Sequence, residues 1–148
     1  GDPAPDFSLK DQNGQTVSLS DFKGKMVLIY FYPKAMTPGC TLQACSVRDS
    51  LGDLADLGMA AVGISSDPVE KQKKFDEKHD LAFPLPSDPD HRVAEAYGVW
   101  GKKKMFGTTR EGIVRSSFLI DEKGEIVKTW YGVKPLETVP DAEKAVSE

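Results

Sequence analysis

Cysteine and histidine are scarce in this sequence, with two of each among 148 residues. A disulfide-stapled secreted fold spaces more cysteines along its chain, so Cys40 and Cys45 are not a disulfide framework. A zinc site needs four converging ligands at characteristic spacings, and the gap between these cysteines is not such a spacing. We therefore expect neither a structural disulfide nor a bound metal.

Long apolar runs and an excess of positive charge are also absent. The longest apolar run, Met26 to Tyr32, is far shorter than the roughly 20 residues that cross a bilayer. No secretory or transit segment is visible, so we expect a cytoplasmic protein without a membrane partner; the start at Gly1 leaves a removed leader open. Acidic residues outnumber basic ones by 23 to 19, and because phosphate binding needs a basic face, we expect no nucleic-acid partner.

The length and composition are those of an ordinary globular protein. A chain of 148 residues falls within the usual range for one domain, so we expect a single domain over residues 1–148. With 39% hydrophobic and 28% charged residues, the chain resembles neither a disordered nor a membrane-embedded protein.

Apolar patterning predicts an N-terminal β-hairpin followed by alternating strands and helices. Alternating runs at 7–9 and 16–19 flank Asn13-Gly14, a strong hairpin signal. Continuous apolar runs at 27–32 and 60–64 predict strands buried on both faces. The remaining predictions are one helix from Pro38 towards Gly58, a helix capped by Asp67 that ends at His79, a helix over 89–97, a surface loop over 99–112, strands at 113–121 and 125–131, and a last helix from Thr138.

This order of elements predicts a three-layer α/β/α architecture around a central mixed sheet. Right-handed crossovers then place Cys40 just beyond the carboxyl end of a central strand. Ligands bind at that edge in open α/β sheets, so Cys40 lies where a functional site is expected.

Cys40 falls in the first turn of the helix that begins near Pro38. Backbone N–H groups there lack partners within the helix, and the helix macrodipole is positive at that end. Both effects favour the thiolate, the reactive form of cysteine. The pair of cysteines by itself leaves open the alternative of two inert buried thiols.

Cys45 lies five residues further along the same predicted helix. Helix geometry separates the two Cα atoms by roughly 8.6 Å and by about 140° around the axis. A disulfide needs Cα atoms about 4.4–6.8 Å apart, so the bond cannot form while the helix is intact. If the pair is a redox couple, the first turns must unwind, and Gly39 offers backbone freedom for this change.

The sequence around Cys40 resembles the peroxiredoxins. Pro33, Thr37 and Cys40 match the Pro-x-x-x-Thr-x-x-Cys signature of that family, and Cys45 followed by Arg48-Asp49 is similar to its bacterioferritin-comigratory, or Q-type, subfamily. The resemblance runs along almost the whole chain, through Ala4-Pro5-Asp6-Phe7, Leu19-Ser20-Asp21-Phe22, Ser87-Asp88, Tyr97-Gly98-Val99-Trp100-Gly101 and Arg115-Ser116-Ser117-Phe118-Leu119-Ile120-Asp121.

The resemblance implies a thioredoxin-like fold and a thiol peroxidase that acts on hydrogen peroxide and organic hydroperoxides. Cys40 would be the peroxidatic cysteine, oxidised to a sulfenic acid, and Cys45 the resolving cysteine that condenses with it into an intramolecular disulfide. Thioredoxin or a similar dithiol would reduce that disulfide. No haem, flavin or metal is needed, and we expect a monomer or a weak homodimer.

Four further residues receive roles from the same resemblance. Pro33 would shield the pocket, and the hydroxyl of Thr37 would hold the thiolate and the incoming peroxide. Arg115 would stabilise the Cys40 thiolate and the charged transition state. Gln43, at a position often held by Glu or Gln in the family, would orient that arginine.

Two other functions remain open alternatives. A thioredoxin-type disulfide oxidoreductase shares the fold but normally carries Cys-x-x-Cys at the helix start, a shorter spacing than the one found here. A non-enzymatic redox sensor could keep the same cysteines, because sensing and peroxidase chemistry begin with the same step. Sustained turnover with thioredoxin would distinguish an enzyme from a pure sensor.

Overall fold

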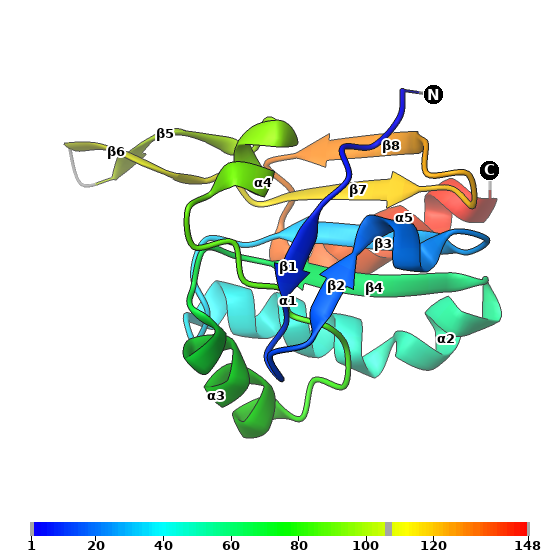
Figure 1. Cartoon of the computed structure of the whole chain (residues 1–148), viewed down its shortest axis with the longest axis horizontal. Coiled ribbons are helices and arrows are strands. Elements are labelled where there is room, and N and C mark those ends of the chain that lie inside the picture. Colours follow the sequence, from blue (N-terminus) through cyan, green and yellow to red (C-terminus); the bar gives the residue numbers. More distant parts are fainter. Residues whose placement is uncertain (1, 106–107, 148) are drawn as a thin grey trace.

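The computed structural model describes residues 2–105 and 108–147. In chain order its elements are β1 (Ser8–Lys10), β2 (Thr16–Ser18), η1 (Leu19–Phe22), β3 (Met26–Phe31), α1 (Pro38–Asp49), α2 (Leu51–Asp56), β4 (Met59–Ile64), α3 (Val69–His79), α4 (Arg92–Ala96), β5 (Trp100–Met105), β6 (Thr108–Ile113), β7 (Ser116–Ile120), β8 (Ile126–Tyr131), η2 (Pro135–Glu137) and α5 (Thr138–Ser147). Figure 1 shows their arrangement.

A four-stranded mixed sheet in the order β4-β3-β7-β8 forms the centre of the fold. β3 pairs parallel with β4 and antiparallel with β7, and β7 pairs antiparallel with β8. The five residues of β3 from Val27 to Phe31 are all buried, as expected of a strand covered on both faces. The predicted central strand and mixed sheet are therefore confirmed.

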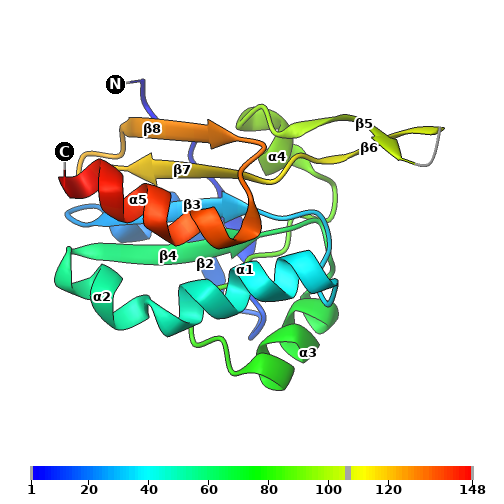
Figure 2. The ribbon, with the colours of Figure 1, turned by 180° about the vertical axis from the view of Figure 1, so that it is seen from behind.

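The two faces of this sheet are covered by different kinds of element (Figures 1 and 2). Helices α1, α2 and α5 lie on one face, and their core includes Leu28 and Tyr30 of β3. The β1–β2 hairpin and α4 cover the other face, where Val27 and Ile29 of β3 are buried. Alternate side chains of one strand therefore serve two separate cores, which gives the predicted three layers.

The predicted helix from Pro38 to Gly58 is in fact two helices. α1 ends at Asp49, Ser50 has φ −104° and ψ 2°, and α2 begins at Leu51. The N–H of Ser50 bonds to the carbonyl of Val47 at 3.1 Å, three residues back, so the α-helical bonding pattern is interrupted. Serine has a modest helix propensity, and its side chain competes for backbone hydrogen bonds.

The prediction of a surface loop over 99–112 is wrong. β5 and β6 pair antiparallel from Trp100–Ile113 to Met105–Thr108 and form a ribbon that projects from the body (Figure 1). Lysines and glycines, including the opposed Gly101 and Gly112, give this ribbon no apolar alternation. Residues 106 and 107 of the predicted loop lie outside the described residues.

Two predicted boundaries also change. α4 covers only Arg92–Ala96 of the helix predicted over 89–97, because His91 adopts a left-handed conformation with φ 49° directly before it. The strand predicted over 113–121 is divided: Ile113 ends β6, and β7 begins at Ser116.

Candidate active site

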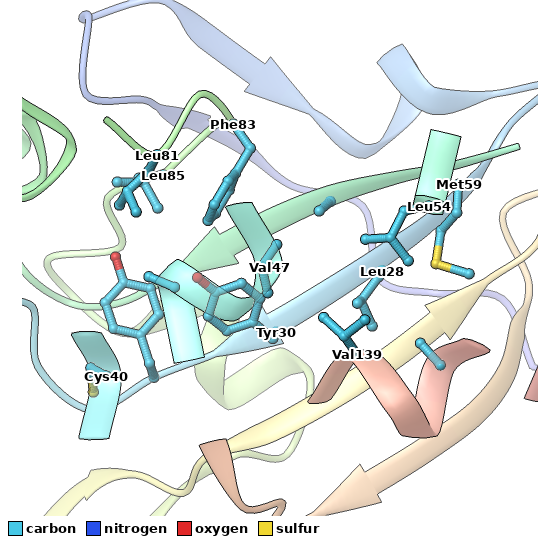
Figure 3. Packing of buried hydrophobic residues seen from close by; sticks show 14 of the residues in the cluster. Leu28, Tyr30, Cys40, Val47, Leu54, Met59, Leu81, Phe83, Leu85 and Val139 are labelled. Carbon is cyan, nitrogen blue, oxygen red and sulfur yellow. The ribbon is translucent and has the colours of Figure 1, made fainter. Parts of the chain in front are cut away.

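Cys40 lies where the sequence predicts it, in the first turn of the helix that follows β3. Thr37 is the N-cap of α1, Pro38 is the first helical residue and Cys40 the third. The side chain of Cys40 is buried, with 1% exposure. Figure 3 shows it at one end of the buried cluster on the helical face, at a distance from Leu54 and Met59. The thiol therefore combines an open helix N-terminus with an apolar surrounding.

Arg115 reaches this helix start because of the strand pairing. β7 runs antiparallel to β3, and Ser116 at the start of β7 pairs with Phe31 at the end of β3. Arg115, one residue earlier, is thereby carried to the loop that leads into α1. Its Nη2 lies 3.4 Å from the Sγ of Cys40 and is placed to donate a hydrogen bond to it. A guanidinium in this position favours a negative charge on the sulfur.

Gln43 bonds to this arginine with one end of its side-chain amide. The Nη1 of Arg115 donates to the Oε1 of Gln43 at 2.6 Å. The Nε2 of Gln43 donates to the Oγ1 of Thr138 at 2.8 Å. Gln43 and Thr138 are both completely buried. A chain of hydrogen bonds therefore runs from the Cys40 sulfur through Arg115 and Gln43 to the first residue of α5.

Gly39 leaves the space that the guanidinium occupies. A Cβ at this position would lie 3.2 Å from the Nη2 of Arg115 and 3.8 Å from the Cγ of Pro135 in η2. The first of these distances is tighter than ordinary van der Waals contact. Besides the backbone freedom expected from the sequence, Gly39 thus allows close approach of the arginine to the helix.

The hydroxyl of Thr37 donates to the backbone carbonyl of Lys34 at 2.7 Å and makes no capping hydrogen bond to α1. Its oxygen still carries lone pairs that can accept a hydrogen bond. Pro33 lies at the beginning of the same loop and is half-buried. Pro33 and Thr37 therefore both lie in the loop that leads from β3 to the N-terminus of α1, before Cys40 in the chain.

Asp67 holds this loop in place and is not the N-cap that the sequence predicts. Pro68 occupies the N-cap position of α3, one residue later. The Oδ2 of Asp67 accepts the N–H of Ala35 at 2.7 Å and the hydroxyl of Ser65 at 2.8 Å. The buried carboxylate thus ties the loop between β3 and α1 to the end of β4. The adjacent Met36 adopts φ 70°, a conformation that costs energy for a residue other than glycine.

Cys45 is half-buried on α1 and packs against the helical-face core. Both cysteines are free thiols in this structure, and α1 is continuous between them. The geometry is therefore the helical one from which the sequence predicts that a disulfide requires unwinding.

Two buried tyrosines share the core with Cys40. Burial raises the pKa of Tyr30 and of Tyr32 well above the usual value of about 10, so both phenols stay protonated beside the site. The hydroxyl of Tyr32 donates to the Oε1 of Gln72 at 2.6 Å. The hydroxyl of Tyr30 has no hydrogen-bond partner within the part of the chain that the structure describes.

Sequence reasoning brought together Cys40, Arg115 and Gln43, and the structure confirms their proximity. It missed Thr138 and Asp67 as parts of the site. Their contacts join residues far apart in the chain, and neither belongs to a motif that signals such contacts. The sequence predicts Asp67 only as a helix cap.

Among the described residues, no group of three or more His, Cys, Asp or Glu side chains could hold a metal ion. Within the same ranges, no helix is both long and apolar enough to span a membrane.

A thiol at a helix N-terminus, beside an arginine in an α/β fold, is the setting of a reactive, nucleophilic cysteine. The model of the AhpC/TSA family matches residues 1–129, and the chain belongs to this family of peroxiredoxins. Peroxiredoxin Bcp of Bacillus subtilis is 51% identical over 142 residues, which cover 96% of this chain and 90% of that protein. Peroxiredoxin Bcp of Escherichia coli is 56% identical over 126 residues, or 85% of this chain and 81% of that protein.

Solved structures agree with this assignment. Peroxidoxin BcpB of Mycobacterium tuberculosis superposes with a TM-score of 0.88 at 36% identity, covering 99% of this chain and 95% of that one. The bacterioferritin comigratory protein of Xanthomonas campestris, described for alkyl peroxide reduction, gives 0.89 at 33% identity over 95% and 90% of the two chains. The thioredoxin-like fold and the thiol peroxidase class expected from the sequence are therefore confirmed.

Proposed function

We propose that Cys40 is the peroxidatic cysteine of this peroxidase, Cys45 its resolving cysteine, and thioredoxin or a similar dithiol its reductant. The observation that carries this proposal is the 3.4 Å contact between the Nη2 of Arg115 and the Sγ of Cys40 at the N-terminus of α1. Helix N-terminus and guanidinium both stabilise the nucleophilic thiolate.

The peroxide step breaks the O–O bond of the substrate. The Cys40 thiolate attacks one peroxide oxygen and becomes a sulfenic acid, which oxidises the sulfur by two electrons. The other oxygen leaves with the electron pair of the broken bond, takes up a proton and departs as water or an alcohol. Arg115 stabilises the negative charge that passes from the sulfur to this leaving oxygen.

Three neighbours complete the proposed reaction site. Thr37, whose proton is bonded to the carbonyl of Lys34, accepts a hydrogen bond from the peroxide O–H, and Pro33 shields the pocket. Contact of the Thr37 hydroxyl with the thiolate, the role that the family resemblance implies, requires it to turn away from Lys34. Gln43 orients Arg115 through its 2.6 Å hydrogen bond.

The resolving step joins the two cysteines. The thiol of Cys45 attacks the sulfenic sulfur of Cys40, an S–S bond forms, and the sulfenic oxygen leaves as water. Residues 40–45 must leave the helical conformation for this step. A dithiol then reduces the disulfide by exchange and becomes oxidised itself, which restores both thiols.

Exposed apolar side chains near the helix start support organic hydroperoxides as substrates in addition to hydrogen peroxide. Met36 and Leu42 lie in the chain on either side of Cys40, and η2, which lies against α1, carries Leu136. Their exposed fractions of 40%, 54% and 58% leave apolar surface that an alkyl chain can contact. The Xanthomonas campestris relative, described for alkyl peroxide reduction, supports the same substrate class.

We further propose that residues 1–148 act as one domain, in the cytoplasm, as a monomer or weak homodimer. Both cores are built on side chains of β3, so this one strand ties them into a single unit. Sedimentation over a range of protein concentrations tests the oligomeric state, and a stable dimer throughout would contradict it.

The first experiment mixes the reduced protein with one equivalent of hydrogen peroxide and maps the product. We expect consumption far faster than by free cysteine, with Cys40 joined to Cys45. Cys40→Ser should abolish the reaction, and Cys45→Ser should stop at the sulfenic acid. Arg115→Gln should slow the peroxide step by about 10²- to 10³-fold, by analogy with loss of one transition-state donor. Arg92→Gln, at an arginine paired with Asp90 on the surface, is the matched control.

A rate like that of an ordinary thiol would contradict the proposal. Fast oxidation without sustained turnover with thioredoxin would favour a redox sensor. An unaffected catalytic cycle in Cys45→Ser would mean that an external thiol resolves the sulfenic acid.

A further inference from the structure

The polar bonds of Gln43 hold the stretch of α1 that lies between the two cysteines. Its side chain is completely buried, and each end of its amide bonds to a residue outside α1, Arg115 at 2.6 Å and Thr138 at 2.8 Å. Thr138 is the first residue of α5 and is itself completely buried. One fixed point is therefore the active-site arginine, and the other is the C-terminal helix.

The apolar attachment of α1 to the body is small. Its buried residues are Cys40, Gln43, Ala44 and Val47, so apart from the reactive thiol only one alanine and one valine contribute fully buried apolar side chains. Apolar burial stabilises a helix roughly in proportion to the area removed from water. Near the C-terminal end of α1, the Nη1 of Arg48 donates to the carbonyl of His79 at 2.6 Å. Between the two cysteines, the two hydrogen bonds of Gln43 add to the small apolar contact in keeping α1 wound and docked.

Arg115 and Thr138 together hold the amide of Gln43. The guanidinium carries only donors, so the Oε1 of Gln43 faces it and accepts its proton, and the Nε2 faces the hydroxyl of Thr138, which can accept. Without this hydroxyl, the Nε2 is buried without its acceptor and the amide is held at one end only. The position of Arg115 beside Cys40 would then be less well defined.

We propose that Thr138 is a positioning residue that, through Gln43, sets the balance between wound and unwound α1. This inference rests on the proposed function, in which peroxide attack needs the wound helix and disulfide formation needs residues 40–45 to unwind. Gln43 lies between the cysteines and must give up both hydrogen bonds during that unwinding. Thr138 lies outside residues 1–129, the part that the family model matches.

The inference predicts effects of opposite sign on two consecutive steps. Loss of the Thr138 hydroxyl should slow attack of the Cys40 thiolate on peroxide, because Arg115 is less well placed. It should speed condensation of the Cys40 sulfenic acid with the Cys45 thiol, which releases water, because α1 unwinds more readily. A residue that only supports the fold would not separate the two rates in this way.

The test compares Thr138→Val, which removes the hydroxyl and keeps the shape, with Thr138→Ser, which keeps the hydroxyl. Reduced protein is mixed with hydrogen peroxide and quenched over time, and mass spectrometry follows loss of thiol, sulfenic acid and disulfide. For Thr138→Val we expect a peroxide step about two- to tenfold slower and a disulfide step faster by a similar factor, the range for one hydrogen bond. Thr138→Ser should restore both rates, and Thr129→Val on β8 should change neither.

Hydrogen exchange in the reduced protein supplies a readout without peroxide. Thr138→Val should speed exchange of the α1 amides and leave those of β3 unchanged. If valine prevents folding, Thr138→Ala carries the same comparison with serine. Unchanged rates, or both steps slowed together, would overturn the role of Thr138. If the wild-type protein itself reacts slowly or forms no Cys40–Cys45 disulfide, the proposed function fails instead.

Discussion

The two faces of the central sheet differ in what they bury. On the face covered by the hairpin and α4, the rings of Phe31, Tyr97 and Phe118 pack against one another with centroids 5.0–5.8 Å apart. On the helical face, the rings of Tyr30 and Tyr32 also pack, with centroids 5.6 Å apart, but the buried side chains include Gln43, which bonds to the arginine beside the Cys40 thiol. Aromatic packing stabilises the fold without charged groups, whereas a reactive thiolate needs hydrogen-bond donors held in a fixed position.

This contrast indicates that one face of the sheet contributes mainly to stability and the other carries the reactive groups. Polar groups that are buried for chemistry cost free energy unless each is paired, and their hydrogen bonds contribute little net stability. An apolar core on the opposite face of the same sheet offsets that cost. Substitutions on the two faces should therefore separate stability from reactivity.

The largest expected effect is on stability, at Phe118. This side chain is 2% exposed and contacts the rings of Phe31, Tyr97 and Tyr131. Phe118→Ala should lower the free energy of unfolding by about 3–5 kcal/mol, the usual cost of such a cavity. Denaturant unfolding measures this loss, while the peroxide rate per folded molecule should stay unchanged. A large fall in that rate would show that the two faces are not separable.

A smaller effect is expected from the two tyrosines on the helical face. Tyr32→Phe leaves the Oε1 of Gln72 buried without its 2.6 Å donor and should cost about 1–3 kcal/mol. Tyr30→Phe removes a hydroxyl that has no partner within residues 2–105 and 108–147, so it should be neutral or stabilising. Thermal unfolding of the two matched variants tests this, and equal losses would contradict the assigned hydrogen bonding.

The smallest expected effect on stability is at Gly39. There, substitution should raise stability but lower the peroxide rate. Gly39→Ala should stabilise α1 by up to about 1 kcal/mol through helix propensity. The new Cβ would press on the guanidinium of Arg115, so the peroxide rate should fall several-fold. Gly52→Ala on α2 is the matched control, because a Cβ there meets nothing within 4 Å. It should gain similar stability without loss of rate.

Much of the architecture could be predicted from local patterns. The apolar run ending in Tyr32 and the helix start at Pro38 are short-range signals, and they place Cys40 correctly. Arg115 required the family resemblance, since only the pairing of β7 with β3 explains its proximity. Thr138 and Asp67 join distant segments through single hydrogen bonds, which leave no periodic trace in the sequence.

The wrong predictions for the β5–β6 ribbon, Ser50 and Asp67 also arise where the structure depends on contacts that leave no pattern in the sequence. The β5–β6 ribbon is stabilised by backbone pairing without an apolar face, so periodicity gave no strand signal. At Ser50 the helix breaks, but the helical spacing of apolar residues continues on either side of the break, so the pattern does not reveal it. Asp67 has the residue type of a cap, but its carboxylate satisfies the loop N–H of Ala35 instead.

The interruption at Ser50 has a further consequence for the proposed catalytic cycle. It separates the helix that carries both cysteines from α2, where Leu54 is completely buried. If α1 unwinds from Cys40 onward, the unwinding can therefore stop at Ser50 and leave α2, with its buried Leu54, in place. Helices of this length form within about a microsecond, so the active site can reset without refolding the domain.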